Sequence, residues 1–207
     1  MYRVTAFAAV LMALLWTSAA PAQTVVYRAV NLGPADRLDV RATPNPNGAI
    51  VARLSPGVRH LDVIETRDGW GRILLRNAGG WVDLAHLAAE PRTPIPGQSA
   101  PGGFHCAGTE PFWGLEIGRD GTGHYNDLST LGDERALTVT ASQSASGREQ
   151  PFVFRFDGEV GGTAIISRQS CSDGMSDRVY GWQAYIEAMD ADGWRFVEGC
   201  CRVPLQE

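Results

Sequence analysis

Apolar and polar residues alternate in short runs along the first half of the chain, and each run ends at a cluster of turn residues. Leu38 to Arg41 alternates strictly, and the Asp68-Gly69 pair between two later runs is typical of a tight hairpin turn. The runs predicted as strands are residues 38–41, 49–54, 58–65, 70–75 and 80–82. Strands this short, at this spacing, predict a small β-barrel.

The second half shows the same kind of pattern and no convincing helical periodicity. Its predicted strands are residues 112–117, 152–156 and 163–167, followed by a hairpin of 180–189 and 194–201 that turns at Asp192-Gly193. Alternate residues of the first hairpin strand share a face that should be buried: Tyr180, Trp182, Ala184, Ile186 and Ala188. We therefore predict an all-β fold, with a second compact β-barrel or sandwich after the first barrel.

Residues 89–103 interrupt these patterns with four prolines and three glycines in 15 residues. Proline lacks a backbone donor and glycine favours turns, so this segment predicts a linker rather than a strand or a helix. The linker divides the chain into one unit of residues 24–88 and another of residues 104–207.

The first 22 residues are typical of a cleavable export signal. A basic start at Arg3 precedes an apolar run, Val4 to Trp16, that is too short for a membrane span, and Ala20-Pro21-Ala22 matches an A-x-A cleavage site. We expect cleavage after Ala22; the alternative is an uncleaved N-terminal anchor. The mature chain should have no membrane span and a periplasmic or secreted location.

All four cysteines lie in the second half, and an even count in an exported protein predicts two disulfides. Neighbours on a strand point to opposite faces, so Cys200 and Cys201 should reach different partners. We expect Cys171–Cys200 with Cys106–Cys201; Cys171–Cys201 with Cys106–Cys200 is the alternative. A metal site is the competing interpretation, but no His or Cys pair has zinc-finger spacing, so we expect no metal and no cofactor.

The net charge of the chain bears on which kinds of partner it can bind. Without residues 1–22 the chain holds 17 basic residues (18 minus Arg3) and 23 acidic ones, a net charge of −6. A nucleic-acid surface needs a basic patch for most of its affinity, so a nucleic-acid partner is not expected.

Four segments of the first half resemble the bacterial SH3 domain over residues 26–88. They are Leu38-Asp39-Val40-Arg41-Ala42-Thr43-Pro44, Leu54-Ser55-Pro56-Gly57, Asp68-Gly69-Trp70-Gly71-Arg72-Ile73 and Gly80-Trp81-Val82, in the order and spacing of that family. The resemblance implies a small SH3-like barrel that binds peptidoglycan or another envelope ligand. Arg41, Trp70 and Trp81 are its candidate ligand residues, although large aromatic residues also pack in cores or at rims.

The second half resembles a family of uncharacterised bacterial envelope proteins over residues 104–202. The motifs that carry the resemblance are G-x-E-P-F-W at residues 108–113, C-x-D-x-M-S at residues 171–176, and Gly199-Cys200 near the end. The family brings no established reaction. Its motifs contribute four further candidate ligand residues, Glu110, Trp113, Asp173 and Asp177.

The acidic members of this set allow two interpretations. Glu110, Asp173 and Asp177 together offer hard oxygen ligands for Ca²⁺ or Mg²⁺. However, the Asp-x-x-x-Asp spacing lacks the regular ligand spacing of a calcium loop. A disulfide-tied turn in which Asp173 and Ser176 cap backbone N–H groups is the favoured interpretation.

A thiol enzyme is the main alternative function. Glu198-Gly199-Cys200-Cys201-Arg202 is similar to the S-H-G-C-x-R segment of L,D-transpeptidases, but Glu198 replaces the histidine that makes the thiolate. Cys106 and His124 have the order of papain-like wall hydrolases, and a disulfide would remove that thiol. We therefore expect a binding protein whose partner is peptidoglycan or an envelope protein; the alternative is a wall-modifying enzyme with an unrecognised site in the second half.

Overall fold

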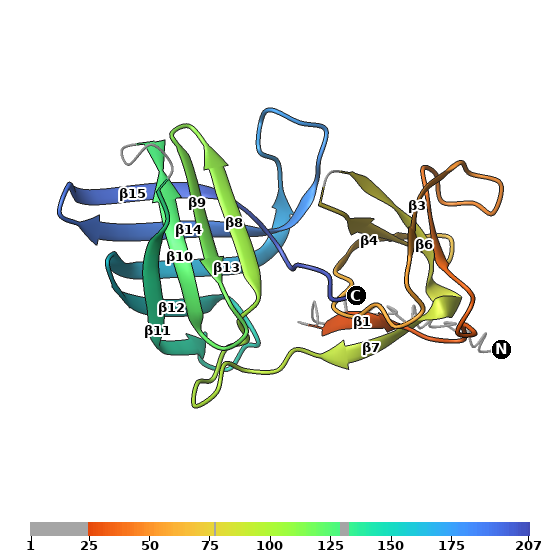
Figure 1. Ribbon diagram of the computed structural model, residues 1–207, viewed down its shortest axis with the longest axis horizontal. Helices are drawn as coiled ribbons and strands as arrows, with labels where there is room; N and C mark the ends of the chain where they lie inside the picture. The colour runs from red at the N-terminus through yellow and green to blue at the C-terminus, as the bar shows by residue number, and fades with distance from the viewer. Residues whose placement is uncertain (1–24, 77, 129–132) are drawn as a thin grey trace, which may run out of the picture.

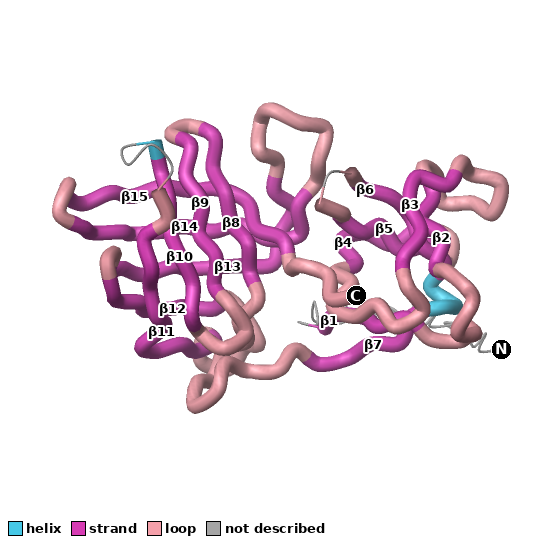
Figure 2. Tube along the Cα trace, in the orientation of Figure 1, coloured by secondary structure: helices cyan, strands magenta, loops and turns pink. Residues whose placement is uncertain are grey.

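The computed structural model describes residues 25–76, 78–128 and 133–207 of the 207-residue chain. The predicted export signal, residues 1–22, lies outside the described residues. Within them the chain forms fifteen strands and one short 3₁₀ turn, η1 (Leu84–His86). Figures 1 and 2 show the strands gathered into two units side by side, so the all-β prediction is confirmed.

The first unit consists of a five-stranded antiparallel sheet and a two-stranded ribbon. The sheet has the order β3-β2-β6-β5-β4, and β1 pairs with β7 in the ribbon. Its strands are β1 (Val25–Ala29), β2 (Leu38–Arg41), β3 (Ile50–Leu54), β4 (Val63–Arg67), β5 (Trp70–Leu74), β6 (Gly79–Asp83) and β7 (Leu87–Pro91). Asp68 and Gly69 both have positive φ, as the predicted hairpin turn between β4 and β5 requires.

The sheet of the first unit is open rather than a closed barrel. Its edge strands β3 and β4 do not pair with each other, and the ribbon bonds to the segment between them instead. Tyr27 N donates to Leu61 O at 2.8 Å, and Ala29 N donates to Val58 O at 2.9 Å. Sheet and ribbon thereby enclose one apolar core: Ala29, Leu38, Val40, Leu54, Val58, Leu61, Val63, Ile73 and Val82.

The second unit is a closed antiparallel barrel of eight described strands in the order β10-β11-β12-β13-β14-β15-β8-β9, with β9 also paired to β10. The strands are β8 (Phe104–Thr109), β9 (Phe112–Ile117), β10 (Thr122–Asp127), β11 (Arg135–Ser144), β12 (Phe152–Gly158), β13 (Gly161–Cys171), β14 (Tyr180–Asp190) and β15 (Gly193–Arg202). The sequence pattern did not predict β8, β10 or β11, because small and polar residues weaken their alternation.

The barrel interior is packed with aromatic and aliphatic side chains. Four of the five residues predicted for the inner face of β14 are buried, and Tyr180 is partly buried. The Trp182 ring centroid lies 5.2 Å from that of Phe104 and 5.9 Å from that of Phe152. Closure of the sheet therefore gives each inward residue a partner across the barrel.

The predicted linker, residues 89–103, joins the two units as a folded strap, and the expectation that it contains no strand is wrong for its first residues. Its first three residues belong to β7, where Pro91 lies opposite Val25. Further along, Ile95 and Ala100 are buried in the barrel core, and the Arg92 guanidinium lies 4.0 Å from the Phe104 ring centroid. Apolar side chains between the prolines supply this packing without the ladder bonds that proline cannot make.

The C-terminal residues return to the first unit, where Figure 1 places the end of the chain beside β1. Arg59 and Gln206 exchange two backbone hydrogen bonds, of 2.8 and 3.0 Å, and Leu205 packs against the first unit's core. The chain therefore crosses between the two units twice, once through the strap and once through this tail.

Two disulfides tie the barrel. Cys106–Cys201 joins β8 to β15, and Cys171–Cys200 joins the end of β13 to β15. This is the first of the two pairings expected, and Cys200 and Cys201 do reach different partners. Disulfides form and persist in oxidising compartments, so the chain fits an extracytoplasmic location. No helix among the described residues is long and apolar enough to cross a membrane.

Candidate functional site

A groove of about 200 Å³ on the first unit contains two of the three residues named from the SH3 resemblance. We call it the Trp70 groove; its lining is Arg37, Leu38, Asp39, Arg41, Pro46, Trp70, Asp83 and His86. The half-buried Trp70 ring supplies an apolar surface among groups of both charges. Such a site suits a ligand that combines carboxylate and ammonium groups with apolar atoms.

The charged groups of the Trp70 groove are held in place. Arg41 Nη2 pairs with Asp39 Oδ2 at 2.9 Å, and Arg41 Nη1 donates to Gly48 O at 2.8 Å. Asp83 Oδ1 accepts from Ala85 N at 2.9 Å at the start of η1. The polar lining is therefore organised before any ligand arrives, which lowers the entropy cost of binding.

The structure does not bring Trp81 to this groove. Its side chain is 7% exposed, and the Arg67 guanidinium lies 5.2 Å from its ring centroid. The position agrees with the packing interpretation of this tryptophan, since a buried indole has no face open to a ligand.

The two motifs of the second unit meet at one end of the barrel. Thr109 Oγ1, from the G-x-E-P-F-W motif, donates to Asp173 O of the C-x-D-x-M-S motif at 2.9 Å. The Asp173 carboxylate in turn accepts from Ser176 N at 2.8 Å, Met175 N at 3.1 Å and Ser176 Oγ at 2.8 Å. Figure 1 shows the loop after β13 and the turn between β8 and β9 rising at this same end.

These bonds support the capped-turn interpretation of the C-x-D-x-M-S motif. Desolvation raises the pKa of Asp173, but the bonds from Ser176, Met175 and Tyr180 outweigh it and hold that pKa below its ordinary value. The carboxylate therefore stays charged and keeps the loop closed over its own backbone.

The alternative of a cation site is not supported by this geometry. Both Asp173 carboxylate oxygens accept bonds within their own loop or from Tyr180, and Glu110 lies in the exposed β8–β9 turn. Trp113 is buried, and its Nε1 donates to Glu198 O at 3.2 Å. Among the described residues, no group of three or more His, Cys, Asp or Glu side chains is arranged to hold a metal ion.

Asp177 lies elsewhere, in a second groove that sequence reasoning missed. This interdomain groove, of about 310 Å³, has one wall from β4, β5 and β6 and the other from the loop before β14. Its lining is Ile64, Arg72, Ile73, Leu74, Ala78, Gly79, Ser176, Asp177, Arg178 and Val179. The two walls lie about a hundred residues apart in the chain, so no local pattern marks the site.

A buried ion pair joins the two units beside the interdomain groove. Asp62, 7% exposed, accepts bonds from the Arg168 guanidinium and from Trp182 Nε1, the latter at 2.9 Å. Arg168 also donates to Val63 O. A buried carboxylate with both oxygens satisfied holds its partners firmly, so these bonds fix the two walls relative to each other.

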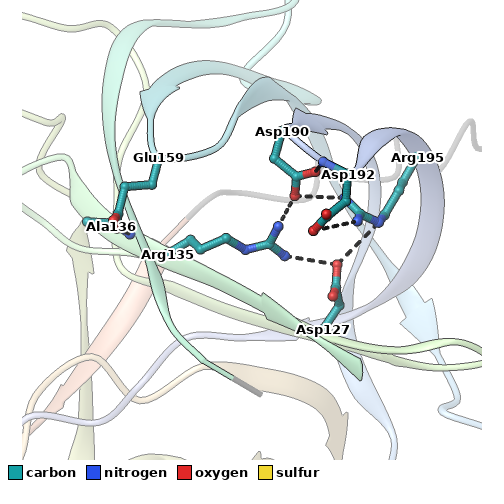
Figure 3. Close-up of polar contacts among 7 residues, drawn as sticks. All are labelled: Asp127, Arg135, Ala136, Glu159, Asp190, Asp192 and Arg195. Carbon is teal, nitrogen blue, oxygen red and sulfur yellow. Dashed lines mark hydrogen bonds and ion pairs between the residues drawn. The ribbon is translucent and has the colours of Figure 1, made fainter. Parts of the chain in front are cut away.

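Four alternating charges gather near the ends of β10, β11, β14 and β15, and Figure 3 shows the contacts among them. Asp127 pairs with Arg135 at 2.9 Å and with Arg195 at 3.4 Å, and Asp190 pairs with Arg195 at 2.8 Å and also with Arg135. The two carboxylates are at most 6% exposed. Burial, with Asp127 next, raises the pKa of nearby Tyr125 to about 12. We interpret this ring as a structural clasp for β10, β11, β14 and β15.

Comparison of the chain with protein-family models, curated protein sequences and solved structures finds no match. The SH3 and envelope-family resemblances therefore stay predictions. The arrangement itself bears on the thiol-enzyme alternative: all four cysteines are described, and all four sulfurs are in disulfides. In this form the chain has no thiol to make the nucleophile that either cysteine mechanism needs.

Proposed function

We propose that this protein is an exported envelope-binding protein, periplasmic or secreted, whose first unit binds peptidoglycan or another envelope ligand through the Trp70 groove. The observation that carries the proposal is the convergence of Arg41 and Trp70 on one groove of mixed charge. A peptidoglycan peptide carries carboxylate and ammonium groups together with short aliphatic side chains. In the proposed complex Arg41 and His86 contact the carboxylates of the ligand, and Asp39 and Asp83 contact its ammonium groups. The Trp70 ring packs on the aliphatic part.

The test is retention of the chain from residue 24 to residue 207 on purified sacculi. Substitution Trp70→Ala removes the apolar surface and Arg41→Ala removes one cation, so each should reduce retention about tenfold, as expected for a central interface residue. Trp194→Ala is the matched control, since Trp194 is 59% exposed on the barrel, away from the groove. Failure of the unaltered chain to bind, or equal retention of all variants, overturns the proposal.

A further inference from the structure

The interdomain groove holds an arginine on each wall. Arg72 lies on β5 of the first unit and Arg178 lies in the loop before β14. Arg72 pairs with Glu65 at 3.4 Å, whereas no carboxylate of the described residues lies within ion-pair distance of the Arg178 guanidinium. Guanidinium groups bind carboxylates and phosphates through paired N–H donors. The groove thus presents one unused cation opposite a second one.

Two further arginines add to this positive region. Burial lowers the pKa of Arg202, and the nearby positive charges of Arg76 and Arg178 lower it further. Guanidinium groups that lie this close together repel one another, and a bound anion between them reduces that repulsion. The carboxylates of this region are Glu65, Glu116, Asp173 and Asp177, and of these only Asp177 belongs to the lining of the groove, together with Arg72 and Arg178.

The loop that presents Arg178 is ordered before a ligand arrives. Asp173 caps its backbone, Thr109 ties it to β8, and Cys171–Cys200 anchors its start. Ser176 Oγ also accepts from Arg178 N at 3.3 Å. The Asp62–Arg168 pair holds the opposite wall at a fixed position. A site with both walls fixed loses little conformational entropy on binding.

We propose that the interdomain groove is a second binding site, for an acidic ligand whose carboxylate or phosphate group lies between Arg72 and Arg178. The apolar part of the ligand packs on the partly exposed side chains of Ile64, Leu74 and Val179. In this arrangement the C-x-D-x-M-S motif is a positioning device: it holds Arg178 at the mouth of a site that only the two units together complete. The proposal is independent of the Trp70 groove.

The test is a titration of ¹⁵N-labelled residues 24–207 with two ligands, inorganic phosphate and N-acetyl-alanyl-alanine, at low ionic strength, followed by NMR. Binding should shift the amide signals of Gly79, Ser176 and Val179 and the guanidinium Nε–H signals of Arg72 and Arg178. Shifts with phosphate alone assign a phosphate ligand, and shifts with the peptide alone assign a carboxylate ligand. Shifts with both assign a general anion site.

Substitution shows whether the arginines carry the binding. Arg72→Gln and Arg178→Gln should each weaken the bound anion about tenfold, the effect of losing one charged hydrogen bond. Arg155→Gln, on the outer face of β12, is the matched control and should leave the affinity unchanged. Asp177→Asn removes a negative charge from the groove, which repels an anionic ligand, and should therefore tighten anion binding. A damaged fold would weaken binding and not tighten it.

Two results overturn the proposal. One is the absence of groove shifts with both ligands. The other is equal affinity in the unaltered chain, Arg72→Gln and Arg178→Gln. Loss of sacculus retention in Trp70→Ala with an intact groove titration shows that the two sites are separate.

Discussion

At the scale of single residues, several motif positions support the backbone rather than face a ligand. Asp173 caps its own loop, Trp113 donates to the backbone of β15, and Trp81 packs under Arg67. Residues of the same types, Trp70 and Asp177, line grooves. Residue type therefore indicated which positions matter, and the surroundings of each side chain decided what it does.

Asp173→Asn is expected to lower the free energy of unfolding by about 1–2 kcal/mol near neutral pH, because the amide accepts fewer of the loop's bonds. The pKa of Asp173 is lowered in the folded state. A carboxyl group whose pKa is lowered by folding stabilises the folded state at any pH above its unfolded-state pKa. That stability is lost as the pH falls through the folded-state pKa. The difference between variant and unaltered chain should therefore shrink below about pH 4, measured by urea unfolding. Asp177→Asn, which disturbs no cap, is the control; a pH-independent difference contradicts this role.

His60 should cause a second dependence of stability on pH. Here the folded state disfavours the charged form of the side chain, whereas at Asp173 it favours the charged form. Burial lowers its pKa to about 4, with Arg119, Arg59 and Arg92 adding to the shift and Glu90 opposing it. A histidine with a lowered pKa takes up its proton more readily when unfolded, so stability is lost as pH falls from about 6.5 towards about 4.

The measurement is the free energy of unfolding in urea across that pH range. His60→Asn, chosen because His60 has a φ of 60° that asparagine tolerates, should flatten the profile. His86→Asn serves as the comparison. An NMR titration that places the His60 pKa at its ordinary value removes the basis of this prediction.

At the scale of elements, charges at the strand ends add to the ladders that close the barrel. The ring of Asp127, Arg135, Asp190 and Arg195 joins strands that lie far apart in the chain. Each arginine of the ring pairs with both carboxylates, so the four charges are coupled to one another.

Arg135→Met is expected to destabilise the chain by about 3–5 kcal/mol, because it leaves two buried carboxylates to share one arginine, Arg195. Arg53→Met, which removes an exposed pair with Asp39, should cost less than about 1 kcal/mol. Chemical unfolding of both variants measures the contrast. Equal effects would show that the ring contributes no more than a surface ion pair.

At the scale of the whole molecule, the strap, the tail and the Asp62 pair make the two units one cooperative structure. Val26 of the first unit even belongs to the buried core of the barrel. Such continuity of core and hydrogen bonds predicts a single unfolding transition.

Asp62→Ala should separate that transition into two, because it leaves Arg168 and the Trp182 indole without their shared carboxylate. Tryptophan fluorescence and far-ultraviolet circular dichroism, followed together during urea unfolding, measure the separation. Asp39→Ala, which removes two ion pairs that lie within the first unit, is the control and should keep the two curves coincident. Coincident curves for Asp62→Ala would mean that the strap and tail alone couple the units.

Strands with strict alternation of apolar and polar residues could be predicted from the sequence. Strands in which small and polar residues interrupt that alternation, such as β8, β10 and β11, could not. The runs that became β2, β5, β9 and β14 alternate clearly, because each has one face in a core. Residues 89–103 were predicted as a linker from their proline content, which describes missing hydrogen bonds and says nothing of the burial of Ile95.

By itself the sequence determined the all-β class, the hairpin turns, the inner face of β14 and the identity of the Arg41 and Trp70 candidates. These depend on local periodicity, on backbone conformations of single residues, or on a motif within one unit. The tertiary structure decided between the two disulfide pairings, turned the linker into a strap, and assembled the interdomain groove. Those outcomes depend on which distant segments meet, and Arg72 and Arg178 line one groove only in the folded chain, where the Asp62–Arg168 pair joins the two units.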